Sequence, residues 1–177
     1  MIWEIETYRT LLTYEPTTGK LYWSKRPRDF FKSDGEMIRW NNRYAGREAF
    51  RVNANGYRSG MILRKCHRAH QVAWLLFYGC WPNGDIDHIN GRRDDNRIEN
   101  LRVVSRKENC RNRKRSAKNR TGVNGVSEHL PGRWRAYIGT DTGNIYLGVF
   151  HSFEAAVAAR KEAEKQHGYH QNHGRAA

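Results

Sequence analysis

One segment near the middle of the chain, residues 85–109, constrains the fold more than any other. Asp85–His88 and Leu101–Val104 are expected to be short strands, and the loop between them is rich in Asn, Gly and Asp. Ser105-Arg106-Lys107-Glu108 then has the spacing of a capping box, in which hydroxyl and carboxylate satisfy free amides of a first helical turn. A helix that carries Asn109 is therefore expected to follow, which gives the order strand, loop, strand, helix.

The sequence before this segment predicts a region of strands and one helix. Residues 1–65 are expected to form a small β-rich region of short strands and turns. A helix is expected from about Arg68 to Tyr78, ended by Gly79 and Pro82. Apolar residues recur at helical spacing within it: Ala69, Val72, Ala73, Leu76 and Phe77. Residues 66–112 are expected to form one domain.

The chain after residue 120 predicts a sheet covered by one helix. Three strands are expected at Gly122–Leu130, Arg133–Thr140 and Asn144–Phe150. Ser152 is expected to cap an alanine-rich helix from Ala155 to about Gln166. Residues 121–177 would then form a domain of three antiparallel strands and a helix, joined to the first part by a linker at 113–120. The fold class is α+β.

Charge and cysteine content limit the partners and the compartment. Lys and Arg outnumber Asp and Glu by 32 to 18, which gives a formal charge of +14 and favours a polyanion partner over a merely basic soluble protein. The three cysteines lack C-x-x-C spacing, so reduced thiols in a cytoplasmic protein are expected. The start of the chain has no signal-peptide pattern, and the apolar run near residues 72–78 is too short to span a bilayer. No membrane partner is expected.

Four residues of the central segment have the chemistry to cut a phosphodiester. His88 can act as a general base, and Asp87 offers a hard oxygen ligand for Mg²⁺ or Mn²⁺. Asn109, twenty-one residues after His88, can supply a second, neutral oxygen ligand. Asn100, twelve residues after His88, is suited to bracing the loop, because a carboxamide both donates and accepts hydrogen bonds.

Each of these residues also has a simpler interpretation. Neighbouring Asp and His residues often only bond locally, and a lone Asn on a helix is usually solvated. Asn90 and Asn96 are interpreted as turn residues, because Asn tolerates left-handed backbone geometry. The indication of catalysis comes from the whole arrangement and not from any one residue.

The arrangement in residues 66–112 resembles the HNH family of nucleases, in the H-N-N form in which asparagine replaces the last histidine. The matching segments are His70-Gln71-Val72-Ala73-Trp74, Asp87-His88-Ile89-Asn90-Gly91, Asp95-Asn96-Arg97-Ile98-Glu99-Asn100-Leu101-Arg102 and Glu108-Asn109. The resemblance implies a ββα-metal (His-Me finger) core. By position it implies His88 as general base, Asp87 and Asn109 as metal ligands and Asn100 as the residue that braces the loop. The family more often has His-Arg before the helix, so His70 is interpreted as a packing residue.

Basic residues after the central segment are expected to follow the DNA backbone, since like charges this dense repel one another unless phosphates screen them. A solvated linker without such contacts is the alternative. The residues concerned are Arg111, Arg113, Lys114, Arg115, Lys118 and Arg120.

Residues 121–168 resemble the plant ethylene-response-factor (Apetala-type) DNA-binding domain. The matching segments are Gly125-Val126-Ser127, Arg133-Trp134-Arg135-Ala136-Tyr137-Ile138, Tyr146-Leu147-Gly148-Val149-Phe150 and Glu154-Ala155-Ala156. Along the middle strand, alternation turns Trp134, Ala136 and Ile138 toward the helix and Arg133, Arg135 and Tyr137 away from it. The resemblance implies that the second face enters a major groove. The residues placed on DNA are Ser127, His129, Arg133, Arg135, Tyr137 and Tyr146, with Asn124 and Asn144 at matching positions.

Together these features predict a site-specific, metal-dependent DNA endonuclease of phage homing type, in the cytoplasm of an infected bacterium. It would leave 5′-phosphate and 3′-hydroxyl ends and, with one active site in a chain expected to be monomeric, would nick; a double-strand break needs a dimer or a second visit. The alternative is a non-catalytic DNA-binding regulator built on an inactive nuclease core. An RNA-binding protein is a third hypothesis, disfavoured because no ribonucleoprotein motif is present.

Overall fold

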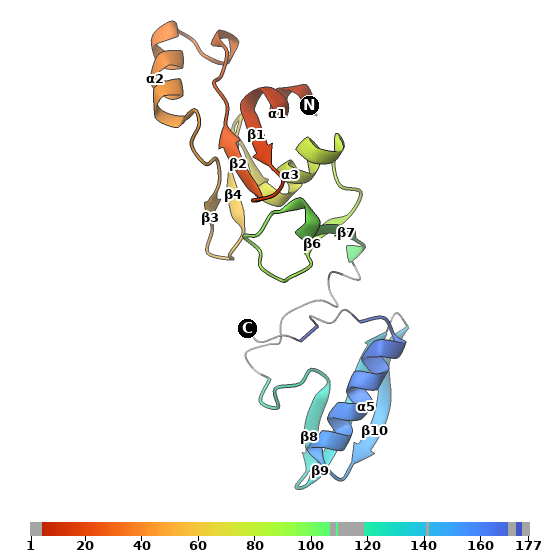
Figure 1. Cartoon of the computed structure of the whole chain (residues 1–177). Coiled ribbons are helices and arrows are strands. Elements are labelled where there is room, and N and C mark those ends of the chain that lie inside the picture. The colour runs from red at the N-terminus through yellow and green to blue at the C-terminus, as the bar shows by residue number, and fades with distance from the viewer. Residues whose placement is uncertain (1–4, 107–108, 110–118, 141, 170–172, 175–177) are drawn as a thin grey trace. The chain divides into compact units, whose positions relative to one another are not determined.

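The computed structural model describes residues 5–106, 109, 119–140, 142–169 and 173–174. The fold mixes helices with small antiparallel sheets (Figure 1). The chain divides into two compact units, Met1–Ser105 and Arg106–Ala177. No helix among the described residues has the length and apolar content that crossing a bilayer requires.

The first unit contains three α-helices and three small sheets. Its helices are α1 (Ile5–Leu11), α2 (Asp34–Tyr44) and α3 (Ala69–Tyr78), with short 3₁₀ turns at Arg28–Phe30 and Ile98–Asn100. Its strands are β1 (Leu12–Glu15), β2 (Lys20–Trp23), β3 (Arg51–Val52), β4 (Arg58–Ile62), β5 (Lys65–Arg68), β6 (Asp85–His88) and β7 (Leu101–Val104). They pair antiparallel as β1–β2, β3–β4–β5 and β6–β7.

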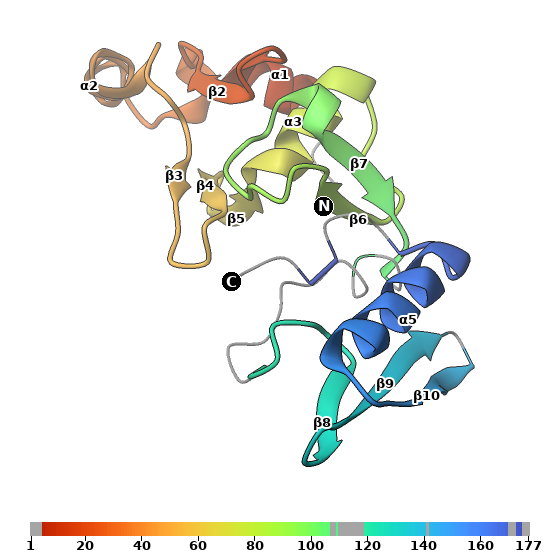
Figure 2. The same cartoon turned by 60° about the horizontal axis from the view of Figure 1, so that its bottom comes forward.

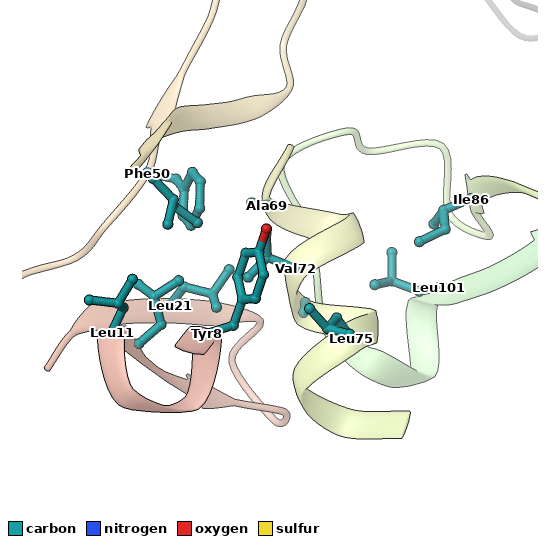
Figure 3. Close-up of a cluster of buried hydrophobic side chains, with 12 residues drawn as sticks. Tyr8, Leu11, Leu21, Phe50, Ala69, Val72, Leu75, Ile86 and Leu101 are labelled. Atoms are coloured by element: carbon teal, nitrogen blue, oxygen red, sulfur yellow. The ribbon is translucent and has the colours of Figure 1, made fainter. Parts of the chain in front are cut away.

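Helix α3 lies at the centre of the core of this unit. Figure 3 shows α3, which carries Val72, between Tyr8 and Leu21 on one side and Ile86 and Leu101 on the other. All five side chains are buried. One hydrophobic core therefore extends across residues 65 and 66, and the N-terminal segment packs with the segment that follows it.

Two helices in residues 1–65 were not expected from the sequence. The prediction of strands and turns is right for β2 and β4, but α1 and α2 interrupt them. Helix α2 begins with a hydrogen bond from the Glu36 amide to the Ser33 hydroxyl (3.3 Å), while the Glu36 carboxylate accepts from the Lys32 amide (3.0 Å). This Ser-x-x-Glu pattern is the signal of a helix start that the sequence interpretation missed.

The central segment agrees closely with its sequence expectation. Strands β6 and β7 have the expected bounds and pair antiparallel. Helix α3 ends at Gly79, which adopts left-handed geometry (φ 78°). Of the helix expected after β7, Arg106 and Asn109 are helical, whereas Lys107 and Glu108 lie outside the described residues. The complete ββα-metal core therefore stays a prediction.

From residue 119 on, the described part of the second unit is a three-stranded sheet with one helix across it (Figure 2). Its elements are β8 (Val126–Leu130), β9 (Arg133–Thr140), β10 (Gly143–Phe150) and α5 (Phe153–Gln166), in the sheet order β10–β9–β8. Ser152 caps α5 by accepting from the Ala155 amide (3.1 Å). Ala136 and Ile138 are fully buried beneath the helix side of the sheet, as the alternation predicts.

A buried arginine ties α5 to the sheet. The Arg160 side chain is only 4% exposed and pairs with Glu164 (2.9 Å). Its guanidinium also donates to the carbonyl of Tyr137 on β9 and contacts the His173 ring nitrogen (3.2 Å). Gly125 leaves room for this group, because a Cβ there would lie 2.9 Å from Arg160 Nη1. The helix is thus fixed by polar as well as apolar contacts.

Candidate active site in the central segment

Strand β6 carries the two residues with the greatest catalytic potential. The β6–β7 register pairs Asp87 with Arg102 and His88 with Leu101. Along β6 burial alternates, with Ile86 and His88 buried and Asp85 and Asp87 partly buried. The hairpin therefore anchors His88 in the protein while leaving Asp87 nearer its surface.

The imidazole of His88 is held by the side chain of Asn96. His88 is 5% exposed, and its Nε2 lies 3.1 Å from Oδ1 of Asn96. A carboxamide oxygen can only accept, so this contact requires the proton on Nε2. The lone pair is then on Nδ1, which is the atom of the ring suited to taking a proton.

The pKa of His88 is lowered from its ordinary value, mainly by burial. The hydrogen bond that His88 donates to Asn96 and the nearby carboxylates of Asp87, Asp95 and Asp94 offset part of this shift. His88 is therefore neutral at pH 7, which is the protonation state that a general base requires.

Two further rings pack around His88. The ring of His70 meets it edge to face, with centroids 5.2 Å apart, and the Tyr57 ring lies 6.0 Å from it. Burial, together with electrostatic interactions with His88 and Arg68, lowers the pKa of His70 to about 3. His70 is thus a neutral packing residue, in agreement with its sequence interpretation, and it limits movement of the His88 ring.

The loop between β6 and β7 is closed by Asn100. Its Nδ2 donates to the Asp95 carbonyl (2.7 Å), and its Oδ1 accepts from the Asn90 amide (2.9 Å). The Arg97 guanidinium bonds the Asp95 carboxylate (2.9 Å) and holds its pKa at about 2. These bonds fix the loop that presents Asn96, and Asn100 makes the two backbone contacts expected of it.

The β1–β2 hairpin supports the same loop from the other side. Tyr14 donates its hydroxyl to the Asn96 carbonyl (2.7 Å), and the Ile98 amide donates to the Pro16 carbonyl (3.2 Å). Gly19 lies so close to this loop that a Cβ at its position would be 2.4 Å from the backbone nitrogen of Arg97. The hairpin is therefore part of the scaffold of the site.

Asn96 is a candidate functional residue that the sequence pattern does not indicate. The sequence predicts a turn residue, but Asn96 is 1% exposed and outside a turn. Its Nδ2 is buried with no hydrogen-bond partner among the described residues. An unpaired buried donor is unfavourable, so the position is set by the contact with His88 and by the backbone around it. Only its occurrence in the polar loop, eight residues after His88, hinted at this role.

The carboxylate of Asp87 is engaged by Arg102. Arg102 donates from Nη2 (2.7 Å) and Nε (3.1 Å), both to Oδ2 of Asp87. Among the described residues, no group of three or more His, Cys, Asp or Glu side chains converges as a metal site. A carboxylate oxygen nevertheless suits Mg²⁺, which proteins often bind through one or two carboxylates together with water and substrate phosphates. The donor chemistry of Asp87 therefore fits the expected ion.

Asn109 and the basic segment after it are placed less fully. Asn109 is helical and belongs to the second unit, whereas Asp87 belongs to the first. Its role as second ligand stays a prediction. Five of the basic residues expected on DNA lie outside the described residues: Arg111, Arg113, Lys114, Arg115 and Lys118. Arg120 is described and exposed.

The sheet of the second unit brings most of its candidate DNA residues onto one face. Arg135 donates to the Ser127 hydroxyl (3.1 Å), and its guanidinium lies 5.9 Å from the Tyr137 ring. Tyr137 and Tyr146, paired across β9 and β10, have ring centroids 5.2 Å apart. Arg133 is exposed on the same strand, where its Nη1 lies 2.9 Å from the His151 ring nitrogen.

Two of the other candidate positions differ in setting. His129 is exposed where the pairing of β8 with β9 shifts register, so it has no direct partner on β9. Asn124 is turned toward the C-terminal segment, with its Nδ2 3.5 Å from the His173 ring nitrogen. Contact of any of these residues with DNA stays a prediction.

Comparison with known proteins identifies one part of the chain. Residues 67–111 match the family model described as HNH endonuclease. The comparisons with curated proteins and with solved structures give no match. The matched segment includes α3, the β6–β7 hairpin, His88, Asn96 and Asn100. The similarity to the HNH endonuclease family thus covers residues 67–111 of this chain.

Proposed function

We propose that this protein is a site-specific, metal-dependent DNA endonuclease of homing type. The observation that carries the proposal is the neutral, buried imidazole of His88, oriented by Asn96 next to Asp87 within the matched domain. A fixed neutral imidazole beside a carboxylate is the equipment for activating water at a phosphodiester.

The reaction follows from the roles of these residues. Nδ1 of His88 takes a proton from a water molecule, whose oxygen bonds to phosphorus as the bond from phosphorus to the 3′ oxygen breaks. The leaving 3′ oxygen takes a proton from solvent water and His88 returns its proton to solvent, so the products are 5′-phosphate and 3′-hydroxyl ends. Asp87, with Asn109 as the predicted second ligand, would hold Mg²⁺ or Mn²⁺, and the ion would supply positive charge at the scissile phosphate. Asn96 fixes the ring orientation, and Asn100 fixes the loop.

The second unit would supply site recognition in this proposal. Its exposed face combines Arg133 and Arg135 with Tyr137 and Tyr146, a basic and aromatic surface on a three-stranded sheet. Such a surface can approach base edges in the major groove. With one His88 in each chain, a monomer would nick one strand, in the cytoplasm of a phage-infected bacterium.

A non-catalytic DNA-binding regulator is the second candidate function. It is favoured by one observation: both bonds from Arg102 go to Oδ2 of Asp87, the residue proposed to hold the metal. If that pair persists on DNA, it competes with the ion. The protein would then bind DNA without cutting it.

Cleavage of covalently closed phage DNA separates the two functions. The wild-type protein is incubated with supercoiled DNA and Mg²⁺, with EDTA in a parallel reaction. We expect the wild type to produce open circles in the reaction with Mg²⁺ and not in the reaction with EDTA. His88→Ala should give no product. His167→Ala, which replaces a histidine at the end of α5, should cut like the wild type. Retained DNA binding by His88→Ala is part of the expectation, since a base acts in the transition state. Tight binding without cutting by the wild type would establish the regulator.

A further inference from the structure

A second site of unassigned chemistry lies in the first unit, away from His88. It is a groove with a volume of about 800 Å³, lined by residues of β2, α2, β3 and β4 and of the segments that connect them. Figures 1 and 2 both show α2 at one edge of the first unit, followed along the chain by β3. Its wall combines tryptophans with five arginines: Arg26, Arg43, Arg47, Arg51 and Arg64.

Arg26 is the least solvated of these cations. Its guanidinium lies 3.8 Å from the ring centroid of Trp40 and 4.9 Å from that of Trp23. Nε of Arg26 is buried and has no hydrogen-bond partner among the described residues. Burial lowers the pKa of this group to about 10. A partly buried cation with an unsatisfied donor is unfavourable unless an anion completes it.

The backbone around Arg26 is held in place before any ligand arrives. The Arg26 amide donates to Oδ1 of Asn41 (2.9 Å), and Nδ2 of Asn41 donates to the Arg26 carbonyl (3.0 Å). Asn41 belongs to α2, which also supplies Trp40 and Arg43 to the groove. Such fixed geometry lowers the ordering cost of binding.

The described residues do not neutralise the positive charge of the groove. Among the described residues, no carboxylate forms an ion pair with Arg26, Arg43 or Arg47. Glu48, the acidic residue of the lining, is paired with Arg58. The groove therefore presents several guanidinium groups without counterions.

A tight turn carries Arg64 into the groove wall. Leu63 and Arg64 form the two-residue loop between β4 and β5 and both have positive φ, 47° and 66°. These are the angles of the turn that fits the twist of a two-stranded hairpin. The position of Arg64 is therefore set by the β4–β5 hairpin.

We propose that this groove binds the phosphodiester backbone of DNA, with its guanidinium groups on phosphates and its aromatic edges against the sugars. Several unpaired arginines spread along a groove match successive phosphates better than one small anion. Contacts to phosphates carry no sequence information. The groove would therefore increase the affinity for DNA and position the protein on it, while the sheet of the second unit would recognise the base sequence. The inference rests on the proposed function, since it requires that the protein binds DNA.

Binding of the full-length protein to a labelled duplex of random sequence, measured by fluorescence anisotropy over a range of salt concentrations, tests the groove. The variant Arg43→Gln/Arg47→Gln removes two exposed cations of the groove, and Arg26→Gln removes the partly buried one. Arg9→Gln is the matched control, because Arg9 is an exposed arginine on α1 outside the groove. Thermal unfolding establishes that each variant is folded.

Each lost phosphate contact should make the slope of log K against log salt less steep by about 0.9. At 0.1 M salt this corresponds to binding roughly eightfold weaker than that of the wild type. We expect this change in the groove variants and not in Arg9→Gln. Equal slopes in groove and control variants, with intact wild-type binding, would overturn the groove alone.

Failure of the wild type to bind DNA would overturn the proposed function as well. Titration with inorganic phosphate tests whether the groove binds a small anion instead of the DNA backbone. Groove variants that lose phosphate binding but keep the wild-type salt slope on DNA would show a small-anion site and overturn the DNA backbone as occupant.

Discussion

Nε2 of His88 lies 3.1 Å from Oδ1 of Asn96, and both side chains are almost completely buried. This contact fixes which nitrogen of the ring carries the proton and therefore which one can accept another. The backbone carbonyl of Asn96 in turn accepts a hydrogen bond from the hydroxyl of Tyr14. The orientation of the proposed base thus depends on a residue of the N-terminal hairpin.

Replacing Asn96 should lower turnover without weakening DNA binding. We expect Asn96→Ala to reduce kcat by roughly 10- to 100-fold, in the range typical of lost supporting contacts, while Kd changes little. In Asn96→Asp a carboxylate would face the Nε2 proton and raise the pKa of His88. The acid limb of its pH–rate profile should move to higher pH than in wild type. An unmoved acid limb in a folded, active Asn96→Asp enzyme would contradict the role.

Gly19→Ala should destabilise the first unit and disturb the catalytic loop. The new Cβ would meet the Arg97 nitrogen at 2.4 Å, in a backbone conformation (φ +73°) that side chains rarely adopt. We expect a loss of about 2 kcal/mol or more in the free energy of unfolding, measured by urea denaturation. Gly46→Ala is the matched control, with φ +77° but nothing within 4 Å. Equal losses in the two variants would show that the close packing contributes nothing.

His70 should make the protein sensitive to acid. Its folded pKa of about 3 lies below the value of about 6.5 in an unfolded chain, so the unfolded state binds the extra proton. Its contribution to stability is complete above about pH 6.5 and is lost as the pH falls toward 3. We expect the fall in Tm between pH 7.5 and 5 to be smaller in His70→Leu than in wild type. The control His167→Leu should retain the full fall, and a His70→Leu curve parallel to it would disprove this.

The basic face of the second unit should determine where the protein binds. Arg133→Ala and Arg135→Ala should broaden the sequences recovered from a random duplex pool, because contacts to base edges carry specificity of about 1–3 kcal/mol each. Slow, unspecific cutting at high protein concentration should remain. Lys161→Ala, an exposed residue on α5, serves as the control. Unchanged site selection in both arginine variants would remove this face from recognition.

The elements with strong local signals could be predicted from the sequence. Strands β6 and β7 were predicted to the residue, and α3 was predicted together with its end at Gly79, because strand pattern, helical spacing and a terminating glycine all agree there. The strands and helix of the second unit follow from alternation and the Ser152 cap. In each case the information lies within a few neighbouring residues.

The rest depends on contacts between distant segments or on a signal that was overlooked. Asn96 has the local character of a turn residue, and only the hairpin residue Tyr14, 82 positions earlier, and the buried ring of His88 reveal another role. Helix α2 has no buried side chain, so its apolar pattern is weak. The capping signal of Ser33 and Glu36 is local, and it predicts the start of α2 once it is recognised.

The close packing of Gly19 against Asn96 and Arg97 has a consequence for recombination between proteins of this kind. Recombination near residue 65 would join the β6–β7 hairpin to a foreign hairpin, and the loop that orients His88 would lose its support. A crossover after residue 111 would leave these contacts intact and would also keep Asn109, the predicted second metal ligand, with the matched segment. Hybrids with new target sites should therefore inherit residues 1–111 as one block.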